Sequence, residues 1–551
     1  MKKQAFKLNS IFFLVNSFIV TSLSILSLFS FNYLIEKKQK QNFARGNSGN
    51  SASLNSLNTL NNNQWGLSTI NIENAWLLTG GKDSVRVGVI DTGVWAEHED
   101  LQDNLNTSYD VCYSIDFSTS MYDTDGHGTH VIGILGASNN SIGIDGVCKK
   151  VSITPYRVSH SFYLDNSWYD TACISSLNDA ELQGIDLINF SGSYFEDTYD
   201  FREAFENFDG LIVCAAGNNT TNNDLHLDES YPSTYDFDNI ISVGASNEDD
   251  EPWDFSNYGQ HSVDLFAPGD DIYSTLPFDS YDYYDGTSMA APFVTGTIAL
   301  MKSINPSLSN SQIKSILLST VDVSSNYTGM CLSGGRLNAY SAVKASIPSL
   351  SLGNNSSIQP LDENDFQWYT FIVPNGNYNI SSSGNLNLSA SLYSNPLSSP
   401  LQTASPDNLG NFSLNFGHNN SSNTRFYLKI VNNSSVLSGN YGLSFTNLHT
   451  HHYYDHFVNY GPKHHSYCSC GAYINEFHIM TVDMMGNTCC VLCGATGNIG
   501  PLNYSCFNNY QIIGKDSHLL NNGSIVLSDY DYQAFLENGG YINIFYAKET
   551  D

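Results

Sequence analysis

The chain reads Val85-Arg86-Val87-Gly88-Val89-Ile90-Asp91-Thr92-Gly93, an apolar run that ends in an acid and a glycine. A short apolar run bounded by turn residues predicts a buried strand, with Asp91 at its end. Outward along the chain, residues 125–130 read Asp-Gly-His-Gly-Thr-His, and residues 286–292 read Gly-Thr-Ser-Met-Ala-Ala-Pro. Each segment alone is common in proteins. In chain order, the three supply an acid, a base and a hydroxyl nucleophile.

The chemistry of these residue types indicates hydrolysis of peptide bonds. A serine hydroxyl is a poor nucleophile at neutral pH, so Ser288 needs a base, expected to be His127, that takes its proton. Asp91 is expected to fix the tautomer of His127 and to stabilise the imidazolium. Ser288 precedes the small apolar run 289–296, whose proline is tolerable in a first helical turn. Taken singly, the three residues fit a turn cap, a loop histidine and a helix N-cap equally well.

The order Asp, His, Ser is the order in subtilisin. Residues 62–346 resemble the subtilisin-like serine proteases, the subtilase family, in every diagnostic segment. The resemblance implies an α/β fold of three layers with a mostly parallel central sheet. It also implies that Asn218, at the end of the buried strand 211–217, stabilises the oxyanion together with the backbone N–H of Ser288 at a helix N-terminus. A turn asparagine is the alternative for Asn218.

Substrate binding is also implied by the resemblance, for protein or peptide substrates. The strand 187–193 matches the family segment that pairs with substrate, so a peptide should add to Ser191, Gly192 and Ser193 as an extra strand. The sequence departs from the usual pattern here, where a larger residue followed by glycine is common. The opposite pocket wall is expected from Ala215, Ala216 and Gly217, which are small and predict broad specificity.

A calcium loop follows from the same resemblance and from ligand chemistry. Calcium prefers six to eight oxygen ligands. Asp100, the Asn140 side chain and the carbonyls of Ser138, Ile142 and Ile144 stand at the family spacing, and Asn61 could add one more oxygen. The alternative is an ordinary loop that closes on itself.

The N-terminal region and the charge point to an exported protein. Residues 1–35 contain an apolar run, 11–35, flanked by lysines, which predicts a signal peptide or a membrane anchor. Residues 36–61 are polar, predicted to be a disordered spacer, and too few for a folded pro-domain. The net charge of −32 argues against nucleic acid as a partner. We therefore expect a secreted or membrane-anchored protein outside the cell or at its surface.

Three further segments follow the catalytic region. Residues 349–446 alternate apolar and polar residues between turns, which predicts a β-sandwich, and they resemble bacterial pre-peptidase C-terminal domains. Residues 450–500 hold paired cysteines and histidines that favour a structural zinc site, with disulfides or free thiols as alternatives. The expected ligands are Cys468, Cys470, Cys490 and Cys493, with His465 and His478 as further candidates. Residues 501–551 predict a β tail.

The sequence thus predicts an exported serine endopeptidase that works through an acyl-enzyme, with structural calcium and zinc. The alternative is a catalytically inactive surface protein whose C-terminal modules bind a partner.

Overall fold

The structure is a computed structural model that describes residues 63–106, 122–159, 169–194, 196–225, 230–419, 422–435 and 437–448. Beyond residue 448 it describes only short strands between residues 463 and 547. The apolar run 11–35, the spacer and Asn61 lie outside the described residues, so the predictions made for them stay predictions. Within the described part, no helix is both long and apolar enough to cross a bilayer.

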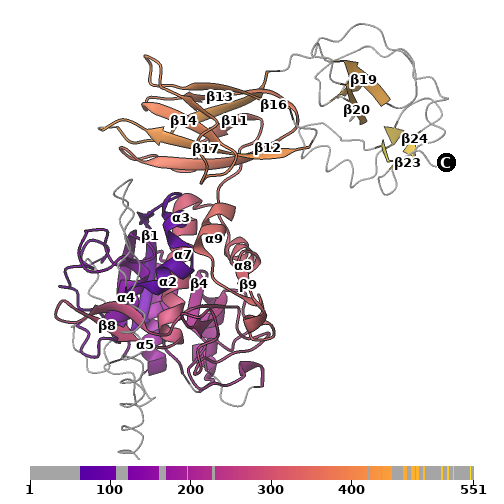
Figure 1. The fold of residues 1–551 in the computed structure, drawn as a ribbon. Coiled ribbons are helices and arrows are strands. Elements are labelled where there is room, and N and C mark those ends of the chain that lie inside the picture. Colours follow the sequence, from indigo (N-terminus) through magenta and orange to yellow (C-terminus); the bar gives the residue numbers. More distant parts are fainter. Residues whose placement is uncertain are drawn as a thin grey trace, which may run out of the picture. The chain divides into compact units, whose positions relative to one another are not determined.

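A central sheet of eight strands organises the first described region, in the order β2-β1-β3-β4-β5-β6-β10-β9. Figure 1 draws this region, with strands β1 and β4 of the sheet labelled among its helices. Each neighbouring pair is parallel except β10 and β9. This mostly parallel sheet confirms the predicted α/β class. The strands are β1 (Gly81–Asp91), β2 (Lys150–Arg157), β3 (Leu187–Phe190), β4 (Leu211–Ala215), β5 (Ile240–Ser246), β6 (Leu265–Pro268), β9 (Asp322–Val323) and β10 (Gly335–Arg336).

Helices cover both faces of this sheet, because its strands are apolar on both sides. On β4, Leu211 and Val213 pack into a core shared with α4 and α7, whereas Ile212 and Cys214 pack into a core shared with α5 and α6. Parallel sheets buried on two faces show such continuous apolar strands. The helices are α2 (Trp65–Thr69), α3 (Ile72–Trp76), α4 (His127–Gly136), α5 (Tyr169–Leu182), α6 (Tyr199–Asn207), α7 (Thr287–Ile304), α8 (Asn310–Ser319) and α9 (Ala339–Ala345).

Strand register brings three predicted segments to one edge of the sheet. Ile90 lies opposite Phe190, and Phe190 lies opposite Cys214. Because these strands are parallel, the residues that follow them emerge side by side, where open α/β sheets bind ligands. Asp91 ends β1, Ser191 follows β3, and Gly217 and Asn218 follow β4. A hairpin of β7 (Ile272–Leu276) and β8 (Ser280–Tyr284) precedes α7.

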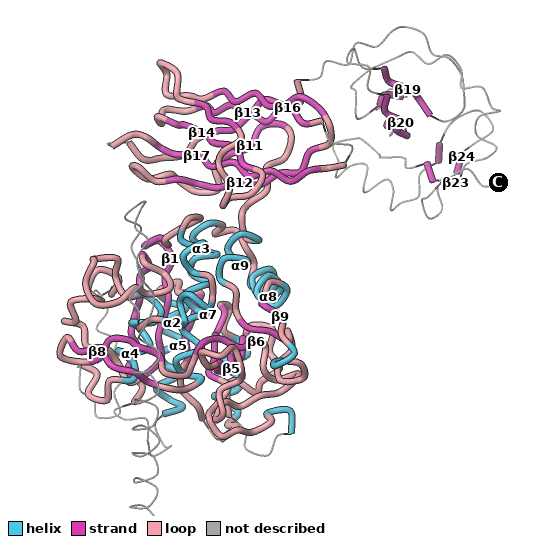
Figure 2. The backbone as a smooth tube through the Cα atoms, viewed as in Figure 1, coloured by secondary structure: helices cyan, strands magenta, loops and turns pink. Residues whose placement is uncertain are grey.

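The later described region contains strands without helices, as Figure 2 shows. Two antiparallel four-stranded sheets enclose an aromatic core that includes Tyr369, Phe371 and Tyr378, which confirms the predicted sandwich. One sheet orders β11 (Gly353–Ser356), β18 (Gly442–Asn447), β13 (Gly376–Ser383) and β16 (Ser413–His418). The other orders β12 (Phe366–Val373), β17 (Thr424–Asn432), β14 (Leu388–Tyr393) and β15 (Gln402–Ala404).

Beyond the sandwich, the described backbone consists of short two-stranded pairs. Cys468, Cys470, Cys493 and His478 lie outside the described residues, so the zinc prediction stays a prediction. The pairs are β19 (Lys463–Tyr467) with β20 (Tyr473–Phe477), β21 (Met480–Val482) with β22 (Thr488–Cys490), β23 (Gln511–Ile512) with β26 (Tyr546–Ala547), and β24 (His518–Leu519) with β25 (Ile525–Val526).

Candidate active site

An acid and a histidine from different elements meet at the carboxyl edge of the sheet. Asp91 is the last residue of β1, and His127 is the first residue of α4. The His127 Nδ1 to Asp91 Oδ1 distance is 2.7 Å, and the two residues are 9% and 6% exposed. A side chain at Gly128 would lie 2.2 Å from the Gly93 carbonyl oxygen, so glycine is required for this close approach. The pair has the geometry of an oriented general base.

The pKa of His127 is set by two opposed effects. Burial of the ring lowers the pKa, while the charge and hydrogen bond of Asp91, with the charges of Asp123 and Asp125, raise it. The net result is a pKa above its usual value. The neighbouring His130 behaves differently, because burial lowers its pKa to about 3. His130 stacks on Tyr284 and stays neutral, so it does not compete as a charged partner for Asp91.

Ser288 lies at the start of α7, 3% exposed, after Gly286 with a φ of 145°. Its hydroxyl donates to the Ser191 carbonyl at 2.9 Å, and the Ser191 hydroxyl donates to the Ser288 carbonyl at 2.8 Å. The sequence placed the proline of this segment in the first helical turn, and that prediction was wrong. Pro292 is the sixth residue of α7, so it withholds the N–H that the Ser288 carbonyl would normally accept. The Ser191 hydroxyl supplies the missing donor.

The side-chain amide of Asn218 has a fixed orientation. Its Oδ1 accepts hydrogen bonds from the backbone N–H and the hydroxyl of Thr287, each at 2.9 Å. With the carbonyl end held there, the Nδ2 end faces Gly286, where an added side chain would lie 3.3 Å from it. The amide donor therefore points toward the segment that carries Ser288. A preorganised donor of this kind can stabilise an oxyanion.

The predicted substrate strand lies beside these residues. Ser191 is fully buried, whereas Gly192 and Ser193 are partly exposed and accessible to a peptide. A side chain at Gly192 would lie 2.3 Å from the Tyr169 hydroxyl, so the short residue leaves room for Tyr169. The Ser193 hydroxyl accepts a hydrogen bond from Ser230 at 2.8 Å. The departure from the usual family pattern thus accompanies a polar pair that the sequence did not predict.

Hydrogen bonds from two asparagines fix the segment that is predicted to form the opposite wall of the substrate pocket. Ala215 ends β4, and Ala216 and Gly217 follow it, with Gly217 at a φ of 109°. The Ala216 carbonyl accepts hydrogen bonds from Asn223 and from Asn257, and the Asn257 Oδ1 accepts the N–H groups of residues 219 and 221. Asn257 is fully buried. Sequence reasoning missed it because no local motif marks it.

Hydrogen bonds join residues of the predicted calcium loop, and the Asp100 carboxylate and Asn140 amide are oxygen donors of the kind that calcium prefers. Asp100 is fully buried, and its Oδ1 has no hydrogen-bond partner among the described residues. Its Oδ2 accepts the Ile144 N–H at 2.8 Å, and its backbone carbonyl accepts the Ser138 N–H at 2.7 Å. The Asn140 Oδ1 accepts the Ile142 N–H at 2.8 Å, which shapes the loop. Burial raises the pKa of Asp100 to about 6, which marks a carboxylate that a cation would stabilise.

Other candidate metal sites and nucleophiles are not evident in the part of the chain that the structure describes. No group of three or more His, Cys, Asp or Glu side chains there could hold a metal ion. The described free thiols are Cys148, Cys173, Cys214 and Cys331, all buried. Burial raises the pKa of Cys148 to about 12, so its thiol is not activated.

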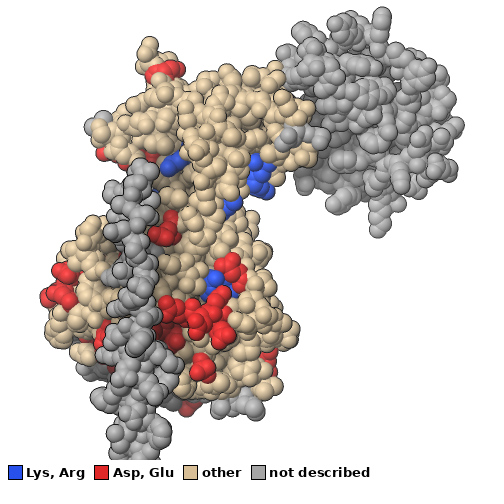
Figure 3. All heavy atoms as spheres, in the orientation of Figure 1, with Lys and Arg blue, Asp and Glu red and all other residues tan. Residues whose placement is uncertain are grey.

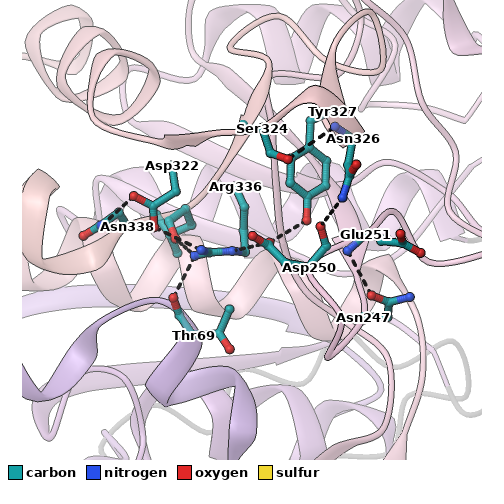
Figure 4. A network of polar contacts seen from close by, with 12 residues as sticks. Thr69, Asn247, Asp250, Glu251, Asp322, Ser324, Asn326, Tyr327, Arg336 and Asn338 are labelled. Atoms are coloured by element: carbon teal, nitrogen blue, oxygen red, sulfur yellow. Dashed lines mark hydrogen bonds and ion pairs between the residues drawn. The ribbon is translucent and has the colours of Figure 1, made fainter.

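A second polar network centres on Arg336 (Figure 4). The guanidinium of Arg336 on β10 contacts Asp250 at 2.7 Å and Asp322 at 3.0 Å. Tyr327 donates to the same Asp250 oxygen at 2.8 Å, and Arg336 also donates to the Thr69 carbonyl. Because Arg336 is 5% exposed, this network is structural, joining the sheet edge to α2. Elsewhere, acidic side chains form patches on the face drawn in Figure 3, in keeping with the charge of −32.

Comparison with known proteins gives one consistent result. The sequence model described as "Subtilase family" matches residues 82–335. Over 291 residues the chain is 36% identical to thermitase of Thermoactinomyces vulgaris, a match that covers 51% of the chain and 96% of thermitase. It is 35% identical to subtilisin DY of Bacillus licheniformis over 241 residues, 43% of the chain and 83% of that protein. It is also 36% identical to subtilisin-like protease 2 of Plasmodium falciparum, where the match spans 44% of the chain but only 19% of the relative's length.

Proposed function

Because the chain belongs to the subtilase family, we propose that residues 62–346 form an exported serine endopeptidase that hydrolyses peptide bonds through Asp91, His127 and Ser288. The observation that carries the proposal is the 2.7 Å contact between the buried Asp91 and His127. The register of β1, β3 and β4 gives further support, because it aligns Asp91 with the residues that follow β3 and β4. Among these, Ser191 is hydrogen-bonded to Ser288, and Asn218 is hydrogen-bonded to Thr287.

The first half of the reaction forms an acyl-enzyme. The Ser288 hydroxyl turns from the Ser191 carbonyl, gives its proton to His127 Nε2 and attacks the scissile carbonyl carbon. Asp91 stays ionised and stabilises the imidazolium. The oxyanion accepts hydrogen bonds from the Ser288 N–H, which as a first-turn donor of α7 has no intrahelical partner, and from the Asn218 Nδ2. The C–N bond then breaks, and His127 protonates the leaving amine.

The second half returns the free enzyme. Water occupies the place of the leaving amine and gives a proton to His127 as it attacks the acyl carbonyl. The same two donors stabilise the second oxyanion. When the tetrahedral intermediate collapses, the Ser288 oxygen leaves and takes back its proton. His127 must be neutral at the start of each half, so activity requires a pH above its raised pKa.

Substrate binding follows the exposed backbone of Gly192 and Ser193, to which a peptide adds as a strand. The opposite wall, Ala215 to Gly217, offers no charged side chain, which favours broad specificity. The chain spans only 19% of the length of subtilisin-like protease 2 of Plasmodium falciparum.

We assign calcium to the loop of Asp100 and Asn140, with the carbonyls of Ser138, Ile142 and Ile144 as further oxygens. The buried Asp100 Oδ1, which has no hydrogen-bond partner in the part of the chain that the structure describes, supports this assignment. The ion would supply positive charge that cross-links two loops, and no catalytic step depends on it. We also propose that residues 11–35 direct export, as a signal peptide or an anchor, and that Cys468, Cys470, Cys490 and Cys493 bind structural zinc.

Casein hydrolysis by purified variants tests the proposed activity. Ser288→Ala should lower kcat by at least about 10⁴-fold, since the remaining groups cannot form an acyl-enzyme. Ser303→Ala is the matched control, because Ser303 is a buried serine of the same helix whose hydroxyl donates to the Ala299 carbonyl. Equal hydrolysis by wild type and Ser288→Ala would refute the assignment.

A further inference from the structure

Asp123 is a buried carboxylate that none of the proposed catalytic steps uses. It is 1% exposed and accepts five hydrogen bonds. Its Oδ1 accepts the hydroxyl of Thr92 at 3.0 Å and the N–H groups of Asp125 and Gly126 at 3.0 and 2.8 Å. Its Oδ2 accepts the N–H and the hydroxyl of Thr129 at 2.9 and 2.7 Å. With five donors aimed at two oxygens, the site requires an anion or a strong acceptor.

The groups that donate hydrogen bonds to Asp123 lie in the segment that carries Asp91 and in the segment that carries His127. Thr92 directly follows Asp91, while Gly126 directly precedes His127. The Thr92 hydroxyl also accepts the Gly128 N–H at 2.8 Å, which closes the connection from β1 to the first turn of α4. A shift of Asp123 would therefore move Asp91 and His127 relative to each other. Errors of about 1 Å in such geometry can cost on the order of 100-fold in rate.

Asp123 also contributes charge next to the base. The charged or titratable groups that act on His127 are Asp91 at the end of β1, Asp123 and Asp125 in the loop before α4, and His130 on α4. Because His130 is neutral, the carboxylates of Asp91, Asp123 and Asp125 are the charges that raise the pKa of His127. Asp125 is exposed and screened by water, whereas Asp123 is buried. At equal separation, a buried charge interacts with the imidazolium of His127 more strongly than an exposed one, because the effective dielectric constant is lower.

We propose that Asp123 is a positioning residue of the catalytic reaction, which aligns Asp91 with His127 through Thr92 and Gly126 and holds the imidazolium with a second buried negative charge. The inference rests on the proposed serine endopeptidase function. This role differs from a purely structural one, since loss of a residue that only stabilises the fold would lower the free energy of unfolding and leave the pKa of His127 unchanged.

The test measures that titration in two ways. First, kcat/KM is measured against pH for wild type and Asp123→Asn, a variant of equal size without the charge. The acid limb should move down by roughly half a pH unit or more, because removal of a nearby anion lowers the pKa of His127. Second, the downfield proton of His127 Nδ1–H is titrated by NMR in the Ser288→Ala background, with and without Asp123→Asn, which requires no activity.

Asp250→Asn is the matched control. It removes the charge of another hydrogen-bonded carboxylate, in the network around Arg336, which contains none of the proposed catalytic residues. It should change the melting temperature and leave the acid limb within about 0.1 pH unit of wild type. If Asp123→Asn titrates like wild type by both measurements, the inference is overturned, whatever its stability. If the NMR shift occurs but wild type hydrolyses nothing, the positioning of His127 stands and the proposed function fails.

A second pair of variants applies when Asp123→Asn does not fold. Thr92→Val removes the hydroxyl that joins Asp123 to Gly128, and Thr92→Ser retains it. We expect Thr92→Val to lower kcat by about 10-fold with KM within about twofold of wild type, and Thr92→Ser to recover most of the loss. The same kcat for all three proteins would contradict the inference.

Discussion

Ser191→Ala tests the reciprocal contact between the substrate strand and the nucleophile. The Ser191 hydroxyl donates to the Ser288 carbonyl at 2.8 Å and accepts the Asn189 Nδ2 at 2.9 Å, and all three residues are buried. The Ser288 carbonyl depends on this contact because Pro292 has no N–H to offer it. The substitution leaves one buried acceptor and one buried donor without these partners.

The expected loss follows from those two groups. Each buried polar group left without its hydrogen bond costs about 1 to 3 kcal/mol, so the free energy of unfolding should fall by roughly 2 to 6 kcal/mol. For a domain of this size, 1 kcal/mol corresponds to about 2 to 4 °C in Tm. Calorimetry should therefore find a Tm lower by at least about 4 °C. The value of kcat should fall as well, because the segment that holds Ser288 loses a hydrogen bond that fixes its position.

A double-mutant cycle with Pro292→Ala isolates the cause. An alanine at this position can donate its N–H to the Ser288 carbonyl, so the loss from Ser191→Ala should be about 1 to 2 kcal/mol smaller in that background. Ser303→Ala, which removes a hydroxyl bonded to the Ala299 carbonyl, should be additive with Pro292→Ala. Additive losses for Ser191→Ala and Pro292→Ala would refute this account of how the helix tolerates its proline.

Three further outcomes follow from the site. Asn218→Ala should lower kcat by about 100- to 1000-fold with little change in KM, the range known for loss of one oxyanion-hole donor in subtilisin, and steady-state kinetics would contradict it by finding the loss in KM alone. The pKa of His127 is raised and its neutral form is the base, so kcat/KM should increase with pH along a limb whose midpoint lies above about 6.5; a midpoint below that value counts against the proposed effect of Asp91. Calcium at about 100 times its Kd should add roughly 2.7 kcal/mol of stability, seen as a Tm that EDTA lowers; Asp100→Asn should abolish the EDTA effect, and an unchanged EDTA effect in that variant would exclude Asp100 as a ligand.

The strands and the principal candidate residues were predictable because local pattern determines them. The apolar runs ending at Asp91, Ser191 and Asn218 predict buried strands, and parallel pairing brings their ends together. The chain order of Asp, His and Ser then limits the chemistry. The subtilase resemblance of residues 62–346, supported by the family match to residues 82–335, supplied the layered architecture.

The polar side chains behind the site were not predictable from sequence. Asp123, Thr287 and Asn257 each contact backbone or side chains that lie elsewhere in the chain, such as the Asn218 amide held by Thr287. No periodicity or spacing encodes the long-range contacts, such as the one from Thr92 to Asp123, since they arise only after the sheet has formed. The position of Pro292 was predicted wrongly for the same reason: the donor that compensates for it comes from a strand about a hundred residues earlier.

The central claim is that Ser288 is a nucleophile activated by His127 and Asp91. A fluorophosphonate reagent forms a covalent adduct only with an activated serine hydroxyl, so mass spectrometry of digested protein tests the claim directly. The account predicts one adduct on the peptide that contains Ser288, and strong loss of labelling in His127→Ala. An unlabelled Ser288 in folded protein, or labelling that His127→Ala leaves unchanged, would contradict it.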